Sequence, residues 1–340
     1  MSYEFLQILW FLLIAILWIG FYFLEGFDFG VGMLLPFIGK KDAERRAIIN
    51  SIGSTWDGNE VWLLTAGGAT FAAFPEWYAT MFSGFYLALF LLLIGLIIRG
   101  VAFEYRSKDA NPTWRHRFDW MIAIGSFLAA LLLGAAFANL ARGVPINENM
   151  MFTGNLFTLL NPYGLLGGVT TTAIFLLHGA NFLGLKLEGE LRERVNATAK
   201  KIWIVTTVLY IALGIYTYVA GFWSRGIVNP GIIPITAVVA LLLTIYFLNH
   251  KMEGWAFIMT ALNIVFTQIT FFTMTFPNVM ISSTNPVWSL TIYNASSSQY
   301  TLTVMSIVAL IFVPIVLVYQ GWTYYMFRKR ITAKKEALVY

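Results

Sequence analysis

The chain has 340 residues, of which 59% are hydrophobic and only 11% are charged, with a net charge of +5. Because an ordinary soluble domain is about 25% charged, this composition excludes a soluble protein. The basic excess indicates loops beside a membrane, so nucleic acid is not an expected partner. The absence of cysteine excludes disulfides, iron–sulfur clusters and thiolate metal sites, and only His116, His178 and His250 offer imidazole ligands.

Long apolar blocks predict an all-α polytopic membrane protein, since about 20 apolar residues cross the hydrocarbon core as a helix. Nine spans are expected: Phe5–Leu35, Thr55–Phe74, Tyr78–Phe103, Phe118–Leu140, Tyr163–Leu185, Ile202–Phe222, Ile232–Leu248, Trp255–Phe276 and Tyr300–Phe327. Residues 1–340 form one membrane domain, with spans one to four over about 5–140, spans five to eight over about 163–276, and span nine over about 300–327. No basic segment or cleavage site precedes the first block, which therefore reads as a span and not a signal peptide.

The basic residues predict the orientation of these spans. Nineteen of the 22 Lys and Arg residues lie in one alternating set of loops and in the C-terminal tail, whereas the other loops hold only Arg142 and Arg225. The tail alone contributes Arg328, Lys329, Arg330, Lys334 and Lys335. By the positive-inside rule, the N-terminus is expected outside and the C-terminus in the cytosol.

Charged residues inside the predicted spans are the main candidates for function, because such charges are costly in a membrane. They are Glu25 and Asp28 in span one, Asp57 and Glu60 in span two, Arg99 and Glu104 in span three, and Asp119 at the start of span four. In the predicted orientation, all of them lie on the cytosolic side. Crowded, partly desolvated carboxyl groups suit proton uptake. The alternative is a buried ion network that locks the helices together, with Arg99 as the counter-ion.

Other features give weaker predictions. His178 in span five is a weak candidate for binding a heme or metal, but no second histidine follows at helical spacing, so a hydrogen-bonded interior histidine is the alternative. No metal site is predicted in this chain. Gly67-Gly68-Ala69 and Gly164…Gly167-Gly168 indicate close helix packing. The polar stretch Asn285–Tyr300 is expected outside, where it caps the outer face or contacts a partner.

Several segments, in order along nearly the whole chain, carry a family resemblance. They include E-G-F-D-F-G-V-G (Glu25–Gly32), W-D-G-N-E-V-W-L (Trp56–Leu63), G-N-L-F-T-L-L-N-P-Y-G-L-L-G-G (Gly154–Gly168) and S-S-Q-Y-T-L (Ser297–Leu302). In these segments the sequence resembles subunit II of the cytochrome bd-type quinol oxidases.

The resemblance implies two four-helix bundles plus one peripheral helix, paired with a similarly folded subunit I in the bacterial cytoplasmic membrane. Subunit I is expected to hold two b-type hemes and one d-type heme, and membrane lipid and a small single-span subunit are further expected partners. The complex would oxidise quinol and reduce dioxygen to water with cytosolic protons, whereas this chain alone would be inactive. The resemblance places a carboxylate proton route at Glu25, where many relatives have Asp, and at Asp57. Glu60 stands where some relatives have Gln.

Two other functions remain to be distinguished from an oxidase subunit. A proton-coupled secondary transporter could use Glu25, Asp28, Asp57 and Arg99, but it would be expected to show polar residues near the midplane in both halves of the chain. Here the charges lie in the first four spans, which favours the oxidase subunit. A purely structural scaffold for subunit I would leave turnover intact when Asp57 is replaced by Asn.

Overall fold

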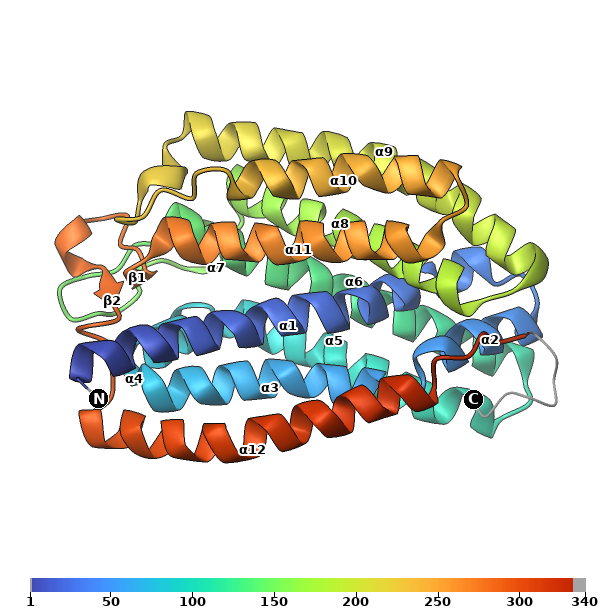
Figure 1. Ribbon diagram of the computed structural model, residues 1–340, viewed down its shortest axis with the longest axis horizontal. Helices are drawn as coiled ribbons and strands as arrows, with labels where there is room; N and C mark the ends of the chain where they lie inside the picture. Colours follow the sequence, from blue (N-terminus) through green and yellow to red (C-terminus); the bar gives the residue numbers. More distant parts are fainter. Residues whose placement is uncertain (1, 333–340) are drawn as a thin grey trace.

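The computed structural model describes residues 2–332 and consists mainly of long helices lying side by side (Figure 1). The helices are α1 (Tyr3–Ile38), α2 (Asp42–Ile52), α3 (Trp56–Ala73), α4 (Pro75–Gly84), α5 (Tyr86–Tyr105), α6 (Pro112–Arg142), α7 (Leu156–Leu159), α8 (Pro162–Lys186), α9 (Gly189–Val219), α10 (Ile233–Asn249), α11 (Glu253–Thr275) and α12 (Gln299–Met326). The predicted all-α class is confirmed. Lys334 and Lys335 of the predicted basic tail lie outside the described residues.

Seven of the described helices are long and apolar enough to cross a membrane: α1, α5, α6, α8, α9, α11 and α12. Helix α10 is apolar but has only 17 residues. Helix α3 has 18 residues, and its first turns carry Asp57 and Glu60. Both helices lie where spans were predicted, so the count of nine spans stays a prediction.

The helices differ in their ends from two of the predicted spans. The third block does not form one helix from Tyr78, because α4 begins with Pro75 in its first turn and ends before Phe85, and α5 starts at Tyr86. The apolar composition runs across this break without marking it. The helix that contains the sixth predicted span, α9, begins at Gly189, before the predicted start of the span at Ile202, because charged residues such as Arg192 and Lys200 favour a helix although they cannot enter lipid.

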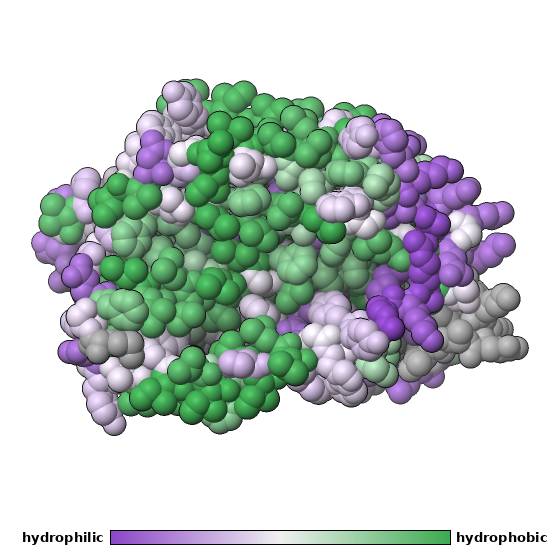
Figure 2. Space-filling view, viewed as in Figure 1, coloured by the Kyte–Doolittle hydropathy of each residue, from purple (hydrophilic) through white to green (hydrophobic). Residues whose placement is uncertain are grey.

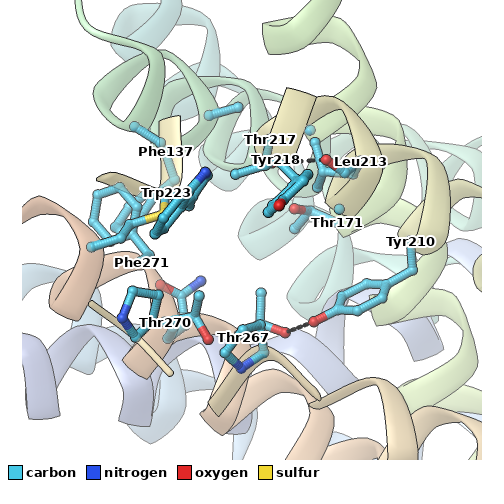
Figure 3. A pocket seen from close by; sticks show the side chains of 18 of the residues that line it. Phe137, Thr171, Tyr210, Leu213, Thr217, Tyr218, Trp223, Thr267, Thr270 and Phe271 are labelled. Carbon is cyan, nitrogen blue, oxygen red and sulfur yellow. Dashed lines mark hydrogen bonds between the residues drawn. The ribbon is translucent and has the colours of Figure 1, made fainter. Parts of the chain in front are cut away.

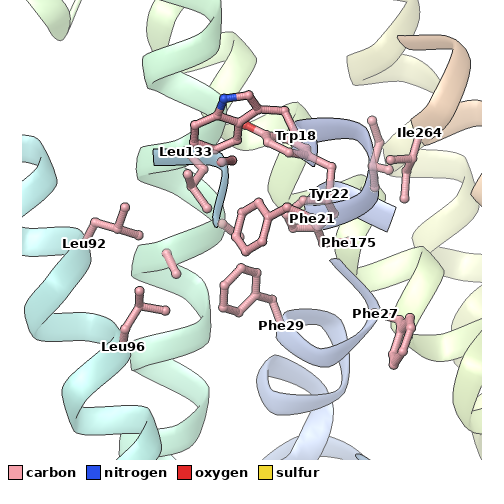
Figure 4. Packing of buried hydrophobic residues seen from close by; sticks show 14 of the residues in the cluster. Trp18, Phe21, Tyr22, Phe27, Phe29, Leu92, Leu96, Leu133, Phe175 and Ile264 are labelled. Carbon is pink, nitrogen blue, oxygen red and sulfur yellow. The ribbon is translucent and has the colours of Figure 1, made fainter. Parts of the chain in front are cut away.

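Helix α1 occupies the centre of the molecule and contacts α3, α6, α8 and α11. Figure 4 shows Phe21 and Phe29 of α1 packed between Leu96 of α5, Leu133 of α6 and Phe175 of α8. The rings of Phe29 and Phe175 have centroids 6.1 Å apart. This aromatic layer fixes the position of the charged turn of α1 that lies within it.

The backbones of α1 and α8 touch at Gly30 and Gly179. A Cβ atom added at Gly30 would lie 1.9 Å from the carbonyl oxygen of Phe175, and one added at Gly179 would lie 2.6 Å from Cα of Gly30. Only glycine permits this approach. The crossing therefore holds α8 directly against the segment of α1 that carries Glu25 and Asp28.

The predicted glycine packing is confirmed within the chain at Gly167 and Gly168, whereas at Gly67 and Gly68 it stays a prediction. Gly167 and Gly168 lie against α6, where an added Cβ would be 2.4 Å from Cβ of Ala138 and 2.7 Å from the carbonyl oxygen of Leu131, respectively. At Gly67 and Gly68, an added Cβ would meet no described atom within 4 Å, so this part of α3 is open on the isolated chain.

The two ends of the helix bundle differ in polarity. At the end with the N-terminus, β1 (Asn278–Met280) pairs with β2 (Leu290–Thr291), and the hydroxyl of Tyr3 donates to the carbonyl of Ser297 over 2.8 Å. On the face shown in Figure 2, apolar side chains form a belt across the middle, and dense hydrophilic side chains lie at the opposite end, near α2 and the start of α9. An apolar belt with one strongly polar end is the surface expected of a membrane protein.

Candidate functional site: a buried carboxylate cluster

Three helices bring an arginine and two carboxylates together inside the bundle. Nη1 of Arg99 on α5 lies 2.6 Å from Oε1 of Glu25 on α1 and 2.9 Å from Oε2 of Glu60 on α3. The side chains of Arg99 and Glu25 are fully buried, whereas that of Glu60 is 23% exposed. The arrangement thus runs from a buried ion pair to a carboxylate that reaches the surface of the chain.

Aromatic rings surround the guanidinium of Arg99. Its central carbon lies 4.9 Å from the ring centroid of Phe29, 5.2 Å from that of Phe103 and 5.6 Å from that of Trp56. Cation–π contacts of this kind are stronger where water is excluded. The rings therefore help to keep a positive charge inside the bundle, beside the carboxylates.

Asp28 lies one helical turn beyond Glu25, on the same face of α1, and is also fully buried. Its Oδ2 accepts a 2.7 Å hydrogen bond from Nδ2 of Asn59, and Oδ1 of Asn59 accepts a 2.8 Å bond from the hydroxyl of Tyr324 on α12. Sequence reasoning missed both partners, because Tyr324 is 265 residues from Asn59 and nothing in the local pattern links them.

Two other predicted carboxylates do not join this cluster. Asp57 follows the first residue of α3 but is exposed, and Glu104 near the end of α5 is exposed as well. Spacing alone places Asp57 and Glu60 on neighbouring positions of one helix face. The packing of α3 turns Glu60 toward Arg99 and leaves Asp57 at the surface of the described chain.

Asp119 belongs to a separate ion-pair network at the same end of the bundle. It is fully buried, with Oδ2 2.8 Å from Nη1 of Arg45 and Oδ1 2.5 Å from Nε of Arg106. Asp42 extends the network, with 3.0 Å to Arg106 and 2.8 Å to Arg115. These pairs tie α2 to α6 and to the short 3₁₀ turn Arg106–Lys108, an arrangement suited to holding helices together.

Glu44 joins α2 to α9 beside this network. Its carboxylate accepts from the backbone N–H groups of Lys40 and Lys41, at 2.8 and 3.2 Å, and pairs with Arg194 at 2.9 Å. Partial burial alone would raise the pKa of Glu44, but these hydrogen bonds and the arginine charge together hold its pKa below the usual value.

His178 is fully buried and has both ring nitrogens engaged. Nδ1 lies 2.8 Å from the hydroxyl of Thr260 and Nε2 lies 3.2 Å from the carbonyl oxygen of Phe23, while the ring stacks on Phe257 with centroids 4.5 Å apart. Among residues 2–332, no three or more His, Asp or Glu side chains are grouped to hold a metal ion.

A cavity of about 480 Å³ lies between α6, α8, α9, α10 and α11 (Figure 3). Its wall is mostly apolar, with hydroxyl pairs between Tyr210 and Thr267 at 2.6 Å and between Tyr163 and Thr217 at 2.8 Å. No Asp, Glu, Lys or Arg lines it. The cavity is therefore distinct from the carboxylate cluster and has no carboxyl group to contribute to proton transfer.

Comparison with known proteins identifies the family to which these features relate. The family model for cytochrome bd terminal oxidase subunit II matches residues 6–327. The chain is 44% identical over 332 residues to cytochrome bd ubiquinol oxidase subunit 2 of Bacillus subtilis, covering 96% of this chain and 97% of the relative. It is 43% identical over 365 residues to cytochrome bd-I ubiquinol oxidase subunit 2 of Escherichia coli K12, covering 97% and 96%.

A solved structure gives a similar fold. A chain of the bd oxidase from Geobacillus thermodenitrificans superposes with a TM-score of 0.77, covering 95% of this chain and 99% of that chain. The sequence identity in this alignment is 15%, so this likeness concerns the fold alone.

Proposed function

Because the chain belongs to the family of cytochrome bd terminal oxidase subunit II, we propose that it is the second subunit of an oxygen-reducing quinol oxidase in the respiratory chain. Its relatives carry ubiquinol oxidase in their names, which supports a quinol as the substrate of the complex. The chain would pair with a subunit I and would be inactive without it. Family membership also disfavours the transporter alternative.

The hemes of the complex are assigned to subunit I, as two b-type hemes and one d-type heme. The histidines of this chain do not fit a heme, because both nitrogens of His178 are bonded within the protein. His116 and His250 are exposed at the end of the bundle that carries α2. Electron transfer therefore needs no step through this chain, whose own residues act on protons and on assembly.

The orientation follows from the charge at the two ends. The hydrophilic end formed by α2 and the start of α9 carries most of the described Lys and Arg residues. We assign this end to the cytosol, with the N-terminus outside the bacterial cytoplasmic membrane. The carboxylate cluster then lies in the cytosolic half of the bundle.

The observation that carries the proton-transfer role is the imbalance of charge around Arg99. Glu25 and Glu60 pair with this one guanidinium, and Asp28 interacts with the same charge without pairing to it; Glu25 and Asp28 are fully buried. Several uncompensated negative charges inside a protein are strongly unfavourable, so such a cluster readily binds protons. While both groups are ionised, Oε2 of Glu25 and Oδ1 of Asp28 have no described hydrogen-bond donor, and a proton on one of the two carboxyl groups would let them hydrogen-bond to each other. Buried polar atoms usually bind protein or water, which makes these oxygens suitable for exchanging protons through water.

Glu60 connects this cluster to the surface of the chain. It is partly exposed and paired with Arg99, so a proton arriving from the cytosolic side could pass from Glu60 to Glu25 and Asp28. Each transfer would move a proton between carboxyl groups around one fixed positive charge. The positive charge of Arg99 would stabilise whichever carboxyl group is ionised between two transfers.

The exposed face of α3 is assigned to contact with subunit I. Asp57, Gly58, Thr65 and Gly68 are exposed on it, and a Cβ added at Gly58 or Gly68 would meet no described atom. A carboxylate and small residues are poorly suited to face lipid but permit a partner helix to approach closely. In this arrangement Asp57 would lie at the boundary between the subunits, where it could pass protons toward subunit I.

Purification of the native complex tests the subunit role. The chain should co-purify with a second membrane subunit that contains all the heme, and the pair should oxidise quinol with dioxygen. Isolation of the chain alone in an active transporting form would contradict this. Replacing Asp57 by Asn then separates proton transfer from a scaffold role: slower oxygen reduction with unchanged heme content supports proton transfer, whereas unchanged turnover supports the scaffold.

A further inference from the structure

Helix α12 lies at the edge of the bundle, yet it reaches the buried cluster through two polar side chains. We propose that Tyr324 and Gln320 are positioning residues that fix the side-chain amide of Asn59 with its NH₂ group toward Asp28. Asp28 is thereby kept as a hydrogen-bond acceptor during proton transfer. The inference rests on the proposed proton path and identifies residues that influence proton exchange at Asp28.

The geometry defines a directed chain of hydrogen bonds. Nε1 of Trp62 donates to Oε1 of Gln320 over 3.0 Å, and Nε2 of Gln320 lies 3.4 Å from the carbonyl oxygen of Gly58 and 3.5 Å from Oδ1 of Asn59. The hydroxyl of Tyr324 donates to the same Oδ1 over 2.8 Å. Nδ2 of Asn59 then donates to Oδ2 of Asp28 over 2.7 Å.

Trp62 sets the direction of this chain of hydrogen bonds, because its donor and acceptor roles cannot be exchanged. An indole N–H is only a donor, so Trp62 requires the oxygen of Gln320 and turns its NH₂ group toward Asn59. That NH₂ group can only donate, and it therefore requires the oxygen of Asn59. A rotated Asn59 amide would place two NH₂ groups against each other and an oxygen against Asp28, which is unfavourable while Asp28 is ionised.

Other charged groups around α1 do not replace this donor. Glu25, Glu60 and Arg99 face Asp28 within the cluster, and Tyr324 faces it from α12. The remaining candidates on the elements packed against α1 are bonded elsewhere: His178 of α8 to Thr260, Asp119 of α6 to Arg45, Glu44 of α2 to Arg194, and Glu253 of α11 to Arg192. The carboxyl group of Glu25 can donate to Asp28 only while it holds a proton, so the amide of Asn59 is the donor to Asp28 that does not titrate.

Removing the two donors on α12 should change when Asp28 exchanges its proton. A fixed N–H donor favours a carboxylate over a carboxylic acid. Without Tyr324 and Gln320, the Asn59 amide can rotate, and the protonated form of Asp28 becomes more favourable. The alkaline limb of the turnover profile should then move to higher pH by about half to one unit, the size expected for one hydrogen bond.

The test uses the intact oxidase complex and measures quinol-dependent oxygen consumption against pH. The double variant Y324F/Q320M should retain its hemes and show the displaced profile, and Y324F alone should show a smaller displacement in the same direction. Y319F is the matched control, because Tyr319 is an exposed tyrosine on α12 whose hydroxyl makes no hydrogen bond to a described residue, and its profile should equal that of the parent. In an N59L background, adding Y324F should cause no further change, since the donor acts through Asn59.

A parental pH profile in Y324F/Q320M would overturn the inference. So would a uniform loss of activity without displacement, which indicates a structural role only. If the double variant fails to assemble, Y324F alone decides, because it removes a single oxygen atom. Glu25→Gln, measured in parallel, separates the two proposals: slow turnover there with a parental Y324F/Q320M profile refutes only the role of α12, whereas normal turnover there refutes the proton path itself.

Discussion

Replacing Arg99 by Met tests whether one guanidinium balances the buried carboxylates. The substitution keeps an unbranched apolar stem but removes the charge that lies 2.6 Å from Glu25 and 2.9 Å from Glu60. Removing one partner of a buried ion pair costs about 3–5 kcal/mol, because it leaves an uncompensated charge inside the protein. Loss of the contacts with three aromatic rings adds about 1 kcal/mol.

The second half of this experiment removes the carboxylate charge of Glu25, which Arg99→Met leaves without its partner. Glu25→Gln added to Arg99→Met leaves a neutral pair, so the double variant should be about 2 kcal/mol more stable than Arg99→Met alone. The assay is the free energy of unfolding of the purified complex in mixed micelles, with heme content as the control for assembly. Destabilisation that is simply additive in the double variant would refute the reasoning, because it would mean that Glu25 and Arg99 do not interact.

Two further predictions concern the fold around the cluster. Gly30→Ala should separate α1 from α8 and reduce the amount of assembled complex, because the added methyl would lie 1.9 Å from the carbonyl oxygen of Phe175. Gly214→Ala is the control and should be tolerated, because a methyl added there would meet no described atom within 4 Å. Equal yields of the two variants would contradict the close crossing. The lowered pKa of Glu44 means that its contribution to stability is complete above its unfolded value of about 4.3 and is lost as the pH falls through the folded-state value. Thermal midpoints should therefore fall more steeply on acidification in the parent than in Glu44→Gln, which lacks the carboxylate pairing with Arg194, and parallel curves would argue against that role.

The sequence predicts the helices better than it predicts their ends. Long apolar blocks are a direct consequence of a lipid environment, so the positions of helices such as α1 and α12 follow from composition. The break at Phe85 does not, since apolar residues lie on both sides of it. The start of α9 was also missed, because hydropathy records where lipid begins and not where helical hydrogen bonding begins.

The members of the carboxylate cluster were only partly predictable. Charges within apolar blocks stand out, and Glu25, Asp28, Glu60 and Arg99 were identified in this way. Their partner Asn59 is uncharged and gives no such signal. Which of the nearby carboxylates turn inward depends on how α3 is rotated against α1 and α5, a property of tertiary packing that spacing along one helix does not determine.

Turnover of the Glu25→Gln complex is the most direct test of the proton path. Glutamine keeps the size of the side chain and can still accept a hydrogen bond, but it cannot carry a proton between carboxyl groups. With heme content and assembly unchanged, oxygen reduction should slow by about tenfold or more, as expected when a proton-transfer group is lost. Glu148→Gln, which alters an exposed carboxylate in the loop after α6, should behave like the parent. Parental turnover of Glu25→Gln at every pH would contradict the proposed path.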